Sequence, residues 1–170
     1  MNETAITTIN NASTVNLGGK YLTFTLDNEE YCITILKIRE IIEMMSITSV
    51  PQTPEFVKGV INLRGRVIPV IDLRLKFEMP SINYSDRTCI IVVEIDNGLE
   101  RINVGCVVDS VSEVLNISTR DIADTPDFGA SLNTDYILGM AKTEGSVKIL
   151  LDIDQVLSRN EVSSLGQTKQ

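Results

Sequence analysis

Carboxylates are the side chains of this sequence with the spacing to do chemistry, since neighbouring acids can act as a general acid and base. Glu94 and Asp96 form one such pair, and Asp109 and Glu113 form another. The sequence has no histidine, which removes the commonest general base and the commonest zinc ligand. Asn97-Gly98 is a hairpin-turn signal, so we expect Glu94 and Asp96 to end a solvated strand. Asp109 and Glu113 have no partner base, and we predict a protein that is not an enzyme.

Cysteine chemistry and phosphate binding have equally little support. Cys32, Cys89 and Cys106 each lie in or beside an aliphatic run, which is typical of small buried hydrophobic residues and not of a disulfide or a metal site. The sequence has no phosphate-binding Gly-Lys-Ser/Thr loop, no Gly-x-Ser-x-Gly elbow and no Cys-x-x-Cys pair. We therefore predict neither a metal nor a cofactor.

Arg64 is the remaining candidate, because it stands in a turn between two aliphatic runs. Such a turn displays the guanidinium on a rigid frame, where it can pair in a bidentate way with a carboxylate of a partner. The alternative is a solvated arginine that binds nothing specific, as most surface charges do. A comparison within the sequence helps to decide between these two interpretations.

The stretch around Arg64 occurs twice. Residues 59–73 align without gaps with residues 139–153, and at a different offset residues 38–42 align with 111–115. The identical pairs in the longer alignment are Gly59/Gly139, Gly65/Gly145, Val67/Val147 and Asp72/Asp152. We expect two related modules. Glu144 takes the place of Arg64 in the second copy, and a purely structural turn would need no reversal of charge.

Short strands must position these residues. Alternating apolar and polar positions between turn signals predict five strands in each copy. They lie at 21–26, 31–35, 39–45, 58–63 and 66–71 in the first copy, and at 87–96, 101–108, 112–117, 136–143 and 147–152 in the second. Regularly spaced short strands of this kind are typical of small barrels.

A few helical turns complete the predicted structure. Pro54 can begin a single helical turn through Phe56. Asp72 can cap a turn that runs to Lys76, and Asp152 can cap a short helix to about Ser158. Residues 118–133 are polar or small and contain proline and glycine, so they are expected to form a long loop.

The composition is that of a folded globular protein, with 43% apolar and 22% charged residues. The formal net charge of −8 argues against nucleic acid and anionic membrane as partners, because both are bound through clustered lysine and arginine. No run reaches the ~20 apolar residues needed to span a bilayer, and the N-terminus lacks a secretory signal, so we expect a cytoplasmic location without direct membrane insertion. Residues 1–18 and 159–170 are expected to be flexible tails.

Several stretches of the sequence form a recognisable set of motifs, namely Phe24-Thr25-Leu26, Ile35-Leu36-Lys37-Ile38-Arg39-Glu40-Ile41, Pro54-Glu55-Phe56-Val57-Lys58-Gly59-Val60-Ile61-Asn62-Leu63-Arg64-Gly65, Pro69-Val70-Ile71-Asp72-Leu73-Arg74, Val107-Val108-Asp109-Ser110-Val111, Thr134-Asp135-Tyr136 and Ile149-Leu150-Leu151-Asp152. Together they resemble the motifs of the CheW family, the coupling adaptors of bacterial chemotaxis. The resemblance covers residues 20–158, with repeats at about 20–77 and 87–158. It implies an all-β fold of two intertwined SH3-like five-stranded β-barrels with a short C-terminal helix.

The resemblance also implies a function. CheW-family adaptors are noncatalytic bridges between the cytoplasmic tips of transmembrane chemoreceptors, the methyl-accepting chemotaxis proteins, and the regulatory domain of the histidine kinase CheA. The expected location is then the cytoplasm, in association with membrane-bound receptor arrays. An adaptor of another chemosensory pathway, such as twitching motility, is the alternative.

Five positions match family positions implicated in partner binding, namely Ile38, Glu40, Gly59, Arg64 and Val114. Barrel packing is the alternative role for Ile38 and Val114. Gly59 has an alternative role as well, since a glycine before a strand commonly serves a special backbone angle.

Overall fold

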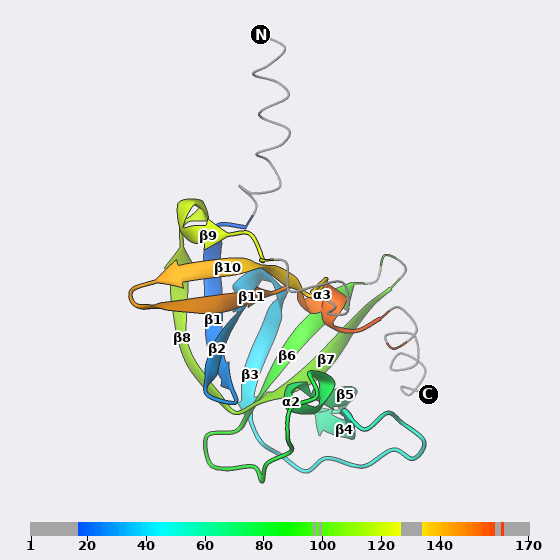
Figure 1. Ribbon diagram of the computed structural model, residues 1–170. Helices are drawn as coiled ribbons and strands as arrows, with labels where there is room; N and C mark the ends of the chain where they lie inside the picture. The colour runs from blue at the N-terminus through cyan, green and yellow to red at the C-terminus, as the bar shows by residue number, and fades with distance from the viewer. Residues whose placement is uncertain (1–16, 97, 99, 127–133, 159–160, 162–170) are drawn as a thin grey trace.

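The computed structural model describes residues 17–96, 98, 100–126, 134–158 and 161. Strands dominate it (Figure 1). They are β1 Gly19–Leu26, β2 Glu29–Thr34, β3 Ile38–Glu43, β4 Val57–Leu63, β5 Arg66–Asp72, β6 Cys89–Asp96, β7 Arg101–Val108, β8 Ser110–Ile117, β9 Ile122–Ala123, β10 Ile137–Thr143 and β11 Ser146–Leu151. The short helices are α2 Leu73–Lys76 and α3 Ile153–Val156, and the 3-10 turns are η1 Ile35–Lys37 and η2 Thr119–Asp121.

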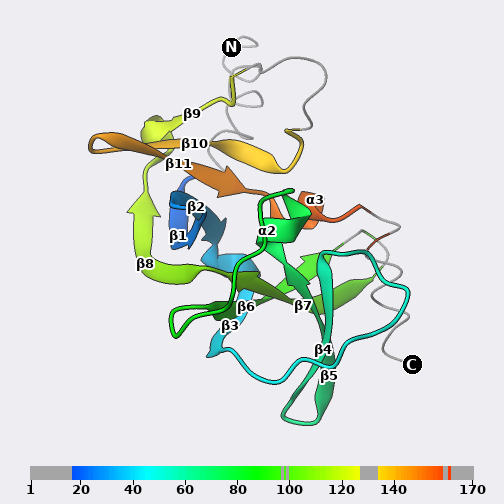
Figure 2. The same ribbon diagram turned by 60° about the horizontal axis from the view of Figure 1, so that its bottom comes forward.

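The strands form two sheets, and each sheet contains strands from both sequence copies. One sheet has the order β8-β1-β2-β11-β10-β9, and the other has the order β3-β6-β7-β5-β4. The first hairpin of each copy has therefore joined the remaining strands of the other copy (Figure 2). Parallel pairing closes each exchange, with Leu150 opposite Cys32 and Val70 opposite Gly105. The all-β prediction and the intertwining of the two copies are confirmed.

The internal repeat is visible in the hydrogen bonds. The pairing of β4 with β5 shifts register between Val57 and Gly59, and that of β10 with β11 shifts at the equivalent place, between Ile137 and Gly139. The amide of Asp72 donates to the carbonyl of Phe56 at 2.8 Å, and that of Asp152 donates to Tyr136 at 2.7 Å. Both aspartates then cap the short helix that follows, as predicted. The two copies share one backbone frame.

Several boundaries differ from the predictions. The predicted helical turn at 54–56 is a single hydrogen-bonded turn, in which the amide of Val57 donates to the carbonyl of Pro54 at 2.9 Å, because β4 begins at once. The helix after Asp152 ends at Val156 instead of near Ser158. The loop expected at 118–133 contains η2 and the two-residue strand β9, while residues 127–133 lie outside the described residues. The first copy has a single bridge in place of β9, between Thr48 and Val60.

The hydrophobic core joins the two sheets into one unit. Its largest cluster combines fully buried side chains of β1 and β2 with fully buried side chains of β6 and β7, for example Phe24 and Ile91. Cys32 and Cys106 are also buried, and burial raises the pKa of the Cys106 thiol to about 12. Cys89 is only partly buried, and none of the three cysteines forms a disulfide. The exchanged hairpins thus supply the centre of the core.

A buried arginine links three elements at the boundary between the copies. The Arg74 side chain lies on α2 and is only 7% exposed. Its Nη1 donates to Asp109 Oδ2 at 2.6 Å, its Nε donates to the carbonyl of Pro80 at 2.9 Å, and its Nη2 lies 3.4 Å from Asp27 Oδ1. Asp109 Oδ2 also accepts from the amide of Asp27 at 2.8 Å. Asp109 therefore has a structural role as the partner of a buried arginine. This role accounts for the residue without any catalytic function.

Candidate functional site

Arg64 occupies the two-residue turn between β4 and β5. Leu63 and Arg66 form the closing pair of the hairpin, and the amide of Gly65 donates to Asn62 Oδ1 at 2.8 Å. Both turn residues have positive φ, 53° for Arg64 and 86° for Gly65, as this class of hairpin turn requires. A left-handed backbone costs a residue with a side chain about 1–2 kcal/mol, and asparagine or glycine would avoid most of this cost. A role for the Arg64 guanidinium would explain why arginine stands in such a turn.

Glu40 on β3 is the ion-pair partner of Arg64. The guanidinium donates from Nη2 to Glu40 Oε2, while 69% of the Arg64 side chain and 31% of the Glu40 side chain remain exposed. Exposed pairs of this kind contribute about 0–1 kcal/mol, so the pair orients Arg64 more than it stabilises the fold. A shallow depression of about 130 Å³ lies beside it, lined by Arg39, Glu40, Leu63, Arg64, Arg66, Ile68, Val92 and Asn103. The structure therefore brings two of the five predicted residues into contact.

Further ion pairs extend this surface along β3, β6 and β7. Arg39 Nη2 lies 2.5 Å from Glu94 Oε2, and Arg101 lies 3.9 Å from Glu94 and 3.4 Å from Asp96. The amide of Gly98 and the neighbouring Arg101 lower the pKa of Asp96. The carboxylates of Glu94 and Asp96 thus form ion pairs with arginines and do not pair with each other. We call the surface formed by Arg39, Glu40, Arg64, Glu94, Asp96 and Arg101 the charged face.

Gly59 serves the backbone. Its φ is 139°, and a Cβ at this position would lie 1.9 Å from the carbonyl oxygen of Thr48. The segment around Thr48 approaches β4 so closely because Thr48 and Val60 exchange backbone hydrogen bonds of 2.8 and 2.9 Å. A side chain at this position would displace the segment around Thr48, so a loss of function in a Gly59 variant would not by itself indicate a contact with a partner.

Ile38 and Val114 lie apart from each other. Ile38 stands at the start of β3, two residues from Glu40, and it is partly buried against the main core cluster. Val114 stands on β8, at the edge of the other sheet, and it is 54% exposed. The packing of Ile38 agrees with its alternative role in the barrel, whereas the exposure of Val114 leaves it available to a partner.

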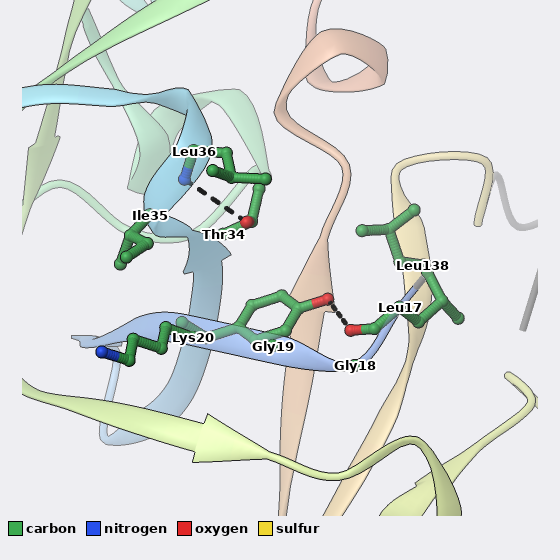
Figure 3. Close-up of a pocket in the computed structure, with 9 residues that line it drawn as sticks. Leu17, Gly18, Gly19, Lys20, Thr34, Ile35, Leu36 and Leu138 are labelled. Carbon is green, nitrogen blue, oxygen red and sulfur yellow. Dashed lines mark hydrogen bonds between the residues drawn. The ribbon is translucent and has the colours of Figure 1, made fainter. Parts of the chain in front are cut away.

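An apolar groove lies where the start of β1, η1 and β10 meet. Its volume is about 430 Å³, and it is lined by Leu17, Gly18, Gly19, Lys20, Tyr21, Thr34, Ile35, Leu36 and Leu138 (Figure 3). Leu36 is 84% exposed, because η1 turns it away from the core. The Thr34 side chain caps this turn by accepting from the amide of Leu36 at 3.4 Å. A short turn before the strand at 39–45 is expected from the sequence, but the groove is not, because Leu17 and Leu138 meet Leu36 only in the folded chain.

Comparison with known proteins agrees with this geometry. The CheW-like domain family matches residues 20–161. The chain belongs to the CheW family. A chemotaxis protein CheW of Klebsiella aerogenes is 40% identical to it over 158 residues, which cover 93% of each chain. Another, of Thermotoga maritima, is 36% identical over 139 residues, covering 80% of this chain and 85% of that protein. The resemblance inferred from the motifs is thereby confirmed.

A solved structure shows the same fold in a CheW-family member. The crystal structure of the scaffolding protein TtCheW from Thermoanaerobacter tengcongensis superposes with a TM-score of 0.74 at 35% sequence identity, covering 85% of this chain and 95% of that one. CheW proteins are chemotaxis scaffolds, and this chain shares both their sequence and their architecture. In the part of the chain that the structure describes, no helix is long and apolar enough to cross a membrane. The same residues contain no group of three side chains suited to hold a metal ion.

Proposed function

We propose that this protein is a noncatalytic adaptor that couples the cytoplasmic tips of chemoreceptors to the regulatory domain of the histidine kinase CheA. An adaptor must hold two partners at once, so it needs two separate surfaces. The charged face belongs to the five-stranded sheet, and the apolar groove belongs to the six-stranded sheet. This separation is the observation that carries the proposal. The relatives named above are chemotaxis proteins, which does not favour an adaptor of twitching motility.

The charged face is the better candidate for the receptor. Arg64 keeps 69% of its side chain exposed while Glu40 fixes its direction, so the remaining guanidinium donors are free to pair with a carboxylate of the receptor tip. Charged contacts of this kind set specificity and association rate more than affinity. That behaviour suits a contact that must transmit the state of the receptor.

The apolar groove is the better candidate for the kinase. A leucine that is 84% exposed beside a groove is the type of residue that anchors a protein interface when a partner covers it. Removing a leucine side chain from water contributes about 1.5–3 kcal/mol. A stable attachment to the kinase would then rest on apolar burial, while the charged face responds to the receptor. The adaptor would remain with the kinase in receptor-associated arrays in the cytoplasm.

Reconstitution tests both halves of the proposal. Purified protein is mixed with CheA and a receptor fragment, and receptor pull-down, kinase pull-down and kinase activity are measured. Arg64→Glu should weaken receptor binding about tenfold and leave kinase binding intact. Leu36→Asp should do the reverse, because it places a charge in an apolar contact. Arg87→Glu is the matched control, since Arg87 is an exposed arginine outside both surfaces.

The two variants give opposite patterns only if the surfaces are separate. Arg64→Glu with normal receptor pull-down and normal kinase activation would refute the role of the charged face. Leu36→Asp with normal kinase binding would refute the role of the groove. Circular dichroism checks that both variants fold, and folding is expected because both side chains are largely exposed.

A further inference from the structure

One short stretch of backbone lines both the apolar groove and the charged face. We call it the η1–β3 segment, residues 34–40. Residues 34–36 form part of the wall of the groove (Figure 3), while Arg39 and Glu40 line the depression in the charged face. In the described part of the chain, no other segment lines both surfaces. A movement at one end of this segment therefore reaches the other surface directly along the backbone.

The η1–β3 segment departs from regular strand geometry at two points. Ile35–Lys37 form the 3-10 turn η1, and the pairing of β3 with β6 shifts register between Ile38 and Glu40. A register shift of this kind is a β-bulge, which bends the strand and redirects the side chain at the bulge. That side chain is Arg39, which pairs with Glu94 on β6. The turn and the bulge together set where the charged face lies relative to the groove.

An ion pair holds the segment between these two irregularities. Lys37 Nζ lies 2.9 Å from Asp154 Oδ2, with 23% of the lysine side chain and 29% of the aspartate side chain exposed. The other oxygen of Asp154, Oδ1, accepts from the amide of Asp96 at 2.9 Å, at the end of β6. Asp154 belongs to α3, whose Ile153 and Val156 are buried in the main core cluster. Lys37 thus ties the η1–β3 segment to a helix that is fixed in the core.

A second ion pair of the same kind lies outside both surfaces. Lys76 Nζ on α2 lies 3.0 Å from Glu161 Oε2, and the two side chains are 20% and 26% exposed. The Lys37–Asp154 and Lys76–Glu161 pairs therefore match in chemistry, length and exposure. Ion pairs that are partly exposed contribute little to the stability of a fold. What distinguishes Lys37 is its position between the groove and the charged face.

We propose that Lys37 and Asp154 are positioning residues that couple the two surfaces to each other. With the pair in place, η1 and the bulge rearrange together, so a partner that fixes η1 in the groove also fixes Arg39 and Glu40. Without the pair, each irregularity rearranges alone. This inference rests on the proposed function, because it needs the kinase at the groove and the receptor at the charged face. By thermodynamic linkage, the effect of each partner on the other's affinity is the same factor.

Binding titrations in both orders measure this factor. Fluorescence anisotropy of a labelled receptor fragment gives the receptor affinity of the purified protein with and without saturating CheA. Isothermal titration calorimetry gives its CheA affinity with and without the receptor fragment. In the wild type, each partner should raise the affinity for the other about tenfold. Direct contacts between receptor and kinase contribute equally in the wild type and in the variants, so the difference between them isolates the part carried by this protein.

The variants remove the ion pair and little else. Lys37→Met keeps a long side chain, and Asp154→Asn keeps an oxygen for the amide of Asp96. Each should reduce the coupling to about twofold or less, while the affinity for either partner alone stays within about threefold of the wild type. Lys37→Arg preserves the pair and should keep most of the coupling. Lys76→Met is the matched control and should leave the coupling unchanged.

The double variant shows whether the two residues act as one unit. Lys37→Met with Asp154→Asn should lose no more coupling than either single variant, because both changes remove the same contact. A wild type whose partners do not affect each other, or Lys37→Met with undiminished coupling, would overturn the inference. Either result leaves the adaptor function standing, since that function requires only that each partner binds. A tenfold loss of both separate affinities in Lys37→Met would also overturn it, because the pair would then only shape the surfaces. A wild type that binds neither partner would refute the adaptor function and this inference together.

Discussion

Replacement of Arg74 by methionine offers a direct test of what holds the two copies together. Methionine keeps a long side chain in the buried space and removes the guanidinium. Arg74 is 7% exposed and joins α2 to Asp109, which lies between β7 and β8, and to Asp27, which lies between β1 and β2. The change therefore breaks the contacts that tie α2 to the β7–β8 junction of the second copy and to the turn between β1 and β2.

The expected loss of stability in Arg74→Met follows from how exposed Asp109 and Asp27 are. Removing one member of a buried ion pair costs about 3–5 kcal/mol, because the other charge is left without compensation. The Asp109 side chain is 20% exposed and keeps its hydrogen bond from the amide of Asp27, which places the cost near 3 kcal/mol. Asp27 is 53% exposed and 3.4 Å from the guanidinium, so its share is about 0–1 kcal/mol.

Equilibrium urea unfolding, followed by tyrosine fluorescence and far-ultraviolet circular dichroism, measures this cost. The chain has no tryptophan, so tyrosine emission is not masked. Arg74→Met should lower the free energy of unfolding by about 3 kcal/mol and the melting temperature by about 6–12 °C. A double-mutant cycle with Asp109→Asn should give a coupling of about 2 kcal/mol, while the same cycle for the exposed Arg39–Glu94 pair should give less than about 1 kcal/mol.

Two outcomes would contradict a stabilising role for the Arg74–Asp109 pair. A coupling below about 0.5 kcal/mol would mean that Arg74 stabilises by packing and not by pairing with Asp109. A loss of less than about 1 kcal/mol in Arg74→Met would mean that the junction between the copies does not depend on this contact.

Three further predictions concern the local surroundings of particular residues. Gly59→Ala should lower the free energy of unfolding by about 3 kcal/mol or more, because the new Cβ clashes with Thr48. Gly65→Ala should lower it by only about 1 kcal/mol, because a Cβ there meets nothing within 4 Å. Equal shifts in the melting temperature of the two variants would contradict this difference. Ellman's reagent should modify Cys89 alone in the native protein, because the other two thiols are buried, and the modified residue is identified by mass spectrometry. Burial acts to raise the pKa of Glu161, but hydrogen bonds from Ser158 and pairing with Lys76 outweigh it, so the folded pKa lies below the ordinary 4.5. Glu161→Gln should therefore destabilise the protein above pH 4.5, and the difference in urea midpoint should shrink below pH 4.5 and vanish as the pH falls through the lowered folded pKa.

Local strand patterns could be read from the sequence because period and turn chemistry are local properties. The predicted strands at 58–63 and 66–71 differ from β4 and β5 by one residue at one end of each. The turn between them was also predictable, since Gly65 permits the backbone angle that the hairpin needs. The repeat was visible for the same reason, because both copies use an aspartate to cap the element after their last strand. These features depend on neighbours in the chain.

Contacts between distant residues could not be read in this way. Asp109 looked like a candidate acid, but its partners, Arg74 and the amide of Asp27, become visible only when the hairpins exchange. The apolar groove was missed because it forms where Leu17, Leu36 and Leu138 meet, and these residues come from three separate segments of the chain. Among the five predicted site residues, the contact between Glu40 and Arg64 depends on how their sheet curls, which no local pattern specifies.

The difference between the two copies is the strongest argument for where this protein binds. A shared frame fixes the same register shift and the same capping aspartates in both copies, so other differences between the copies are not imposed by it. At the turn, the first copy keeps an arginine in a left-handed backbone, although glycine or asparagine would be easier to place. At the equivalent position the second copy has Glu144. Only the first copy has an exposed arginine with a left-handed backbone at this turn, which supports the proposal that Arg64 contacts an acidic partner.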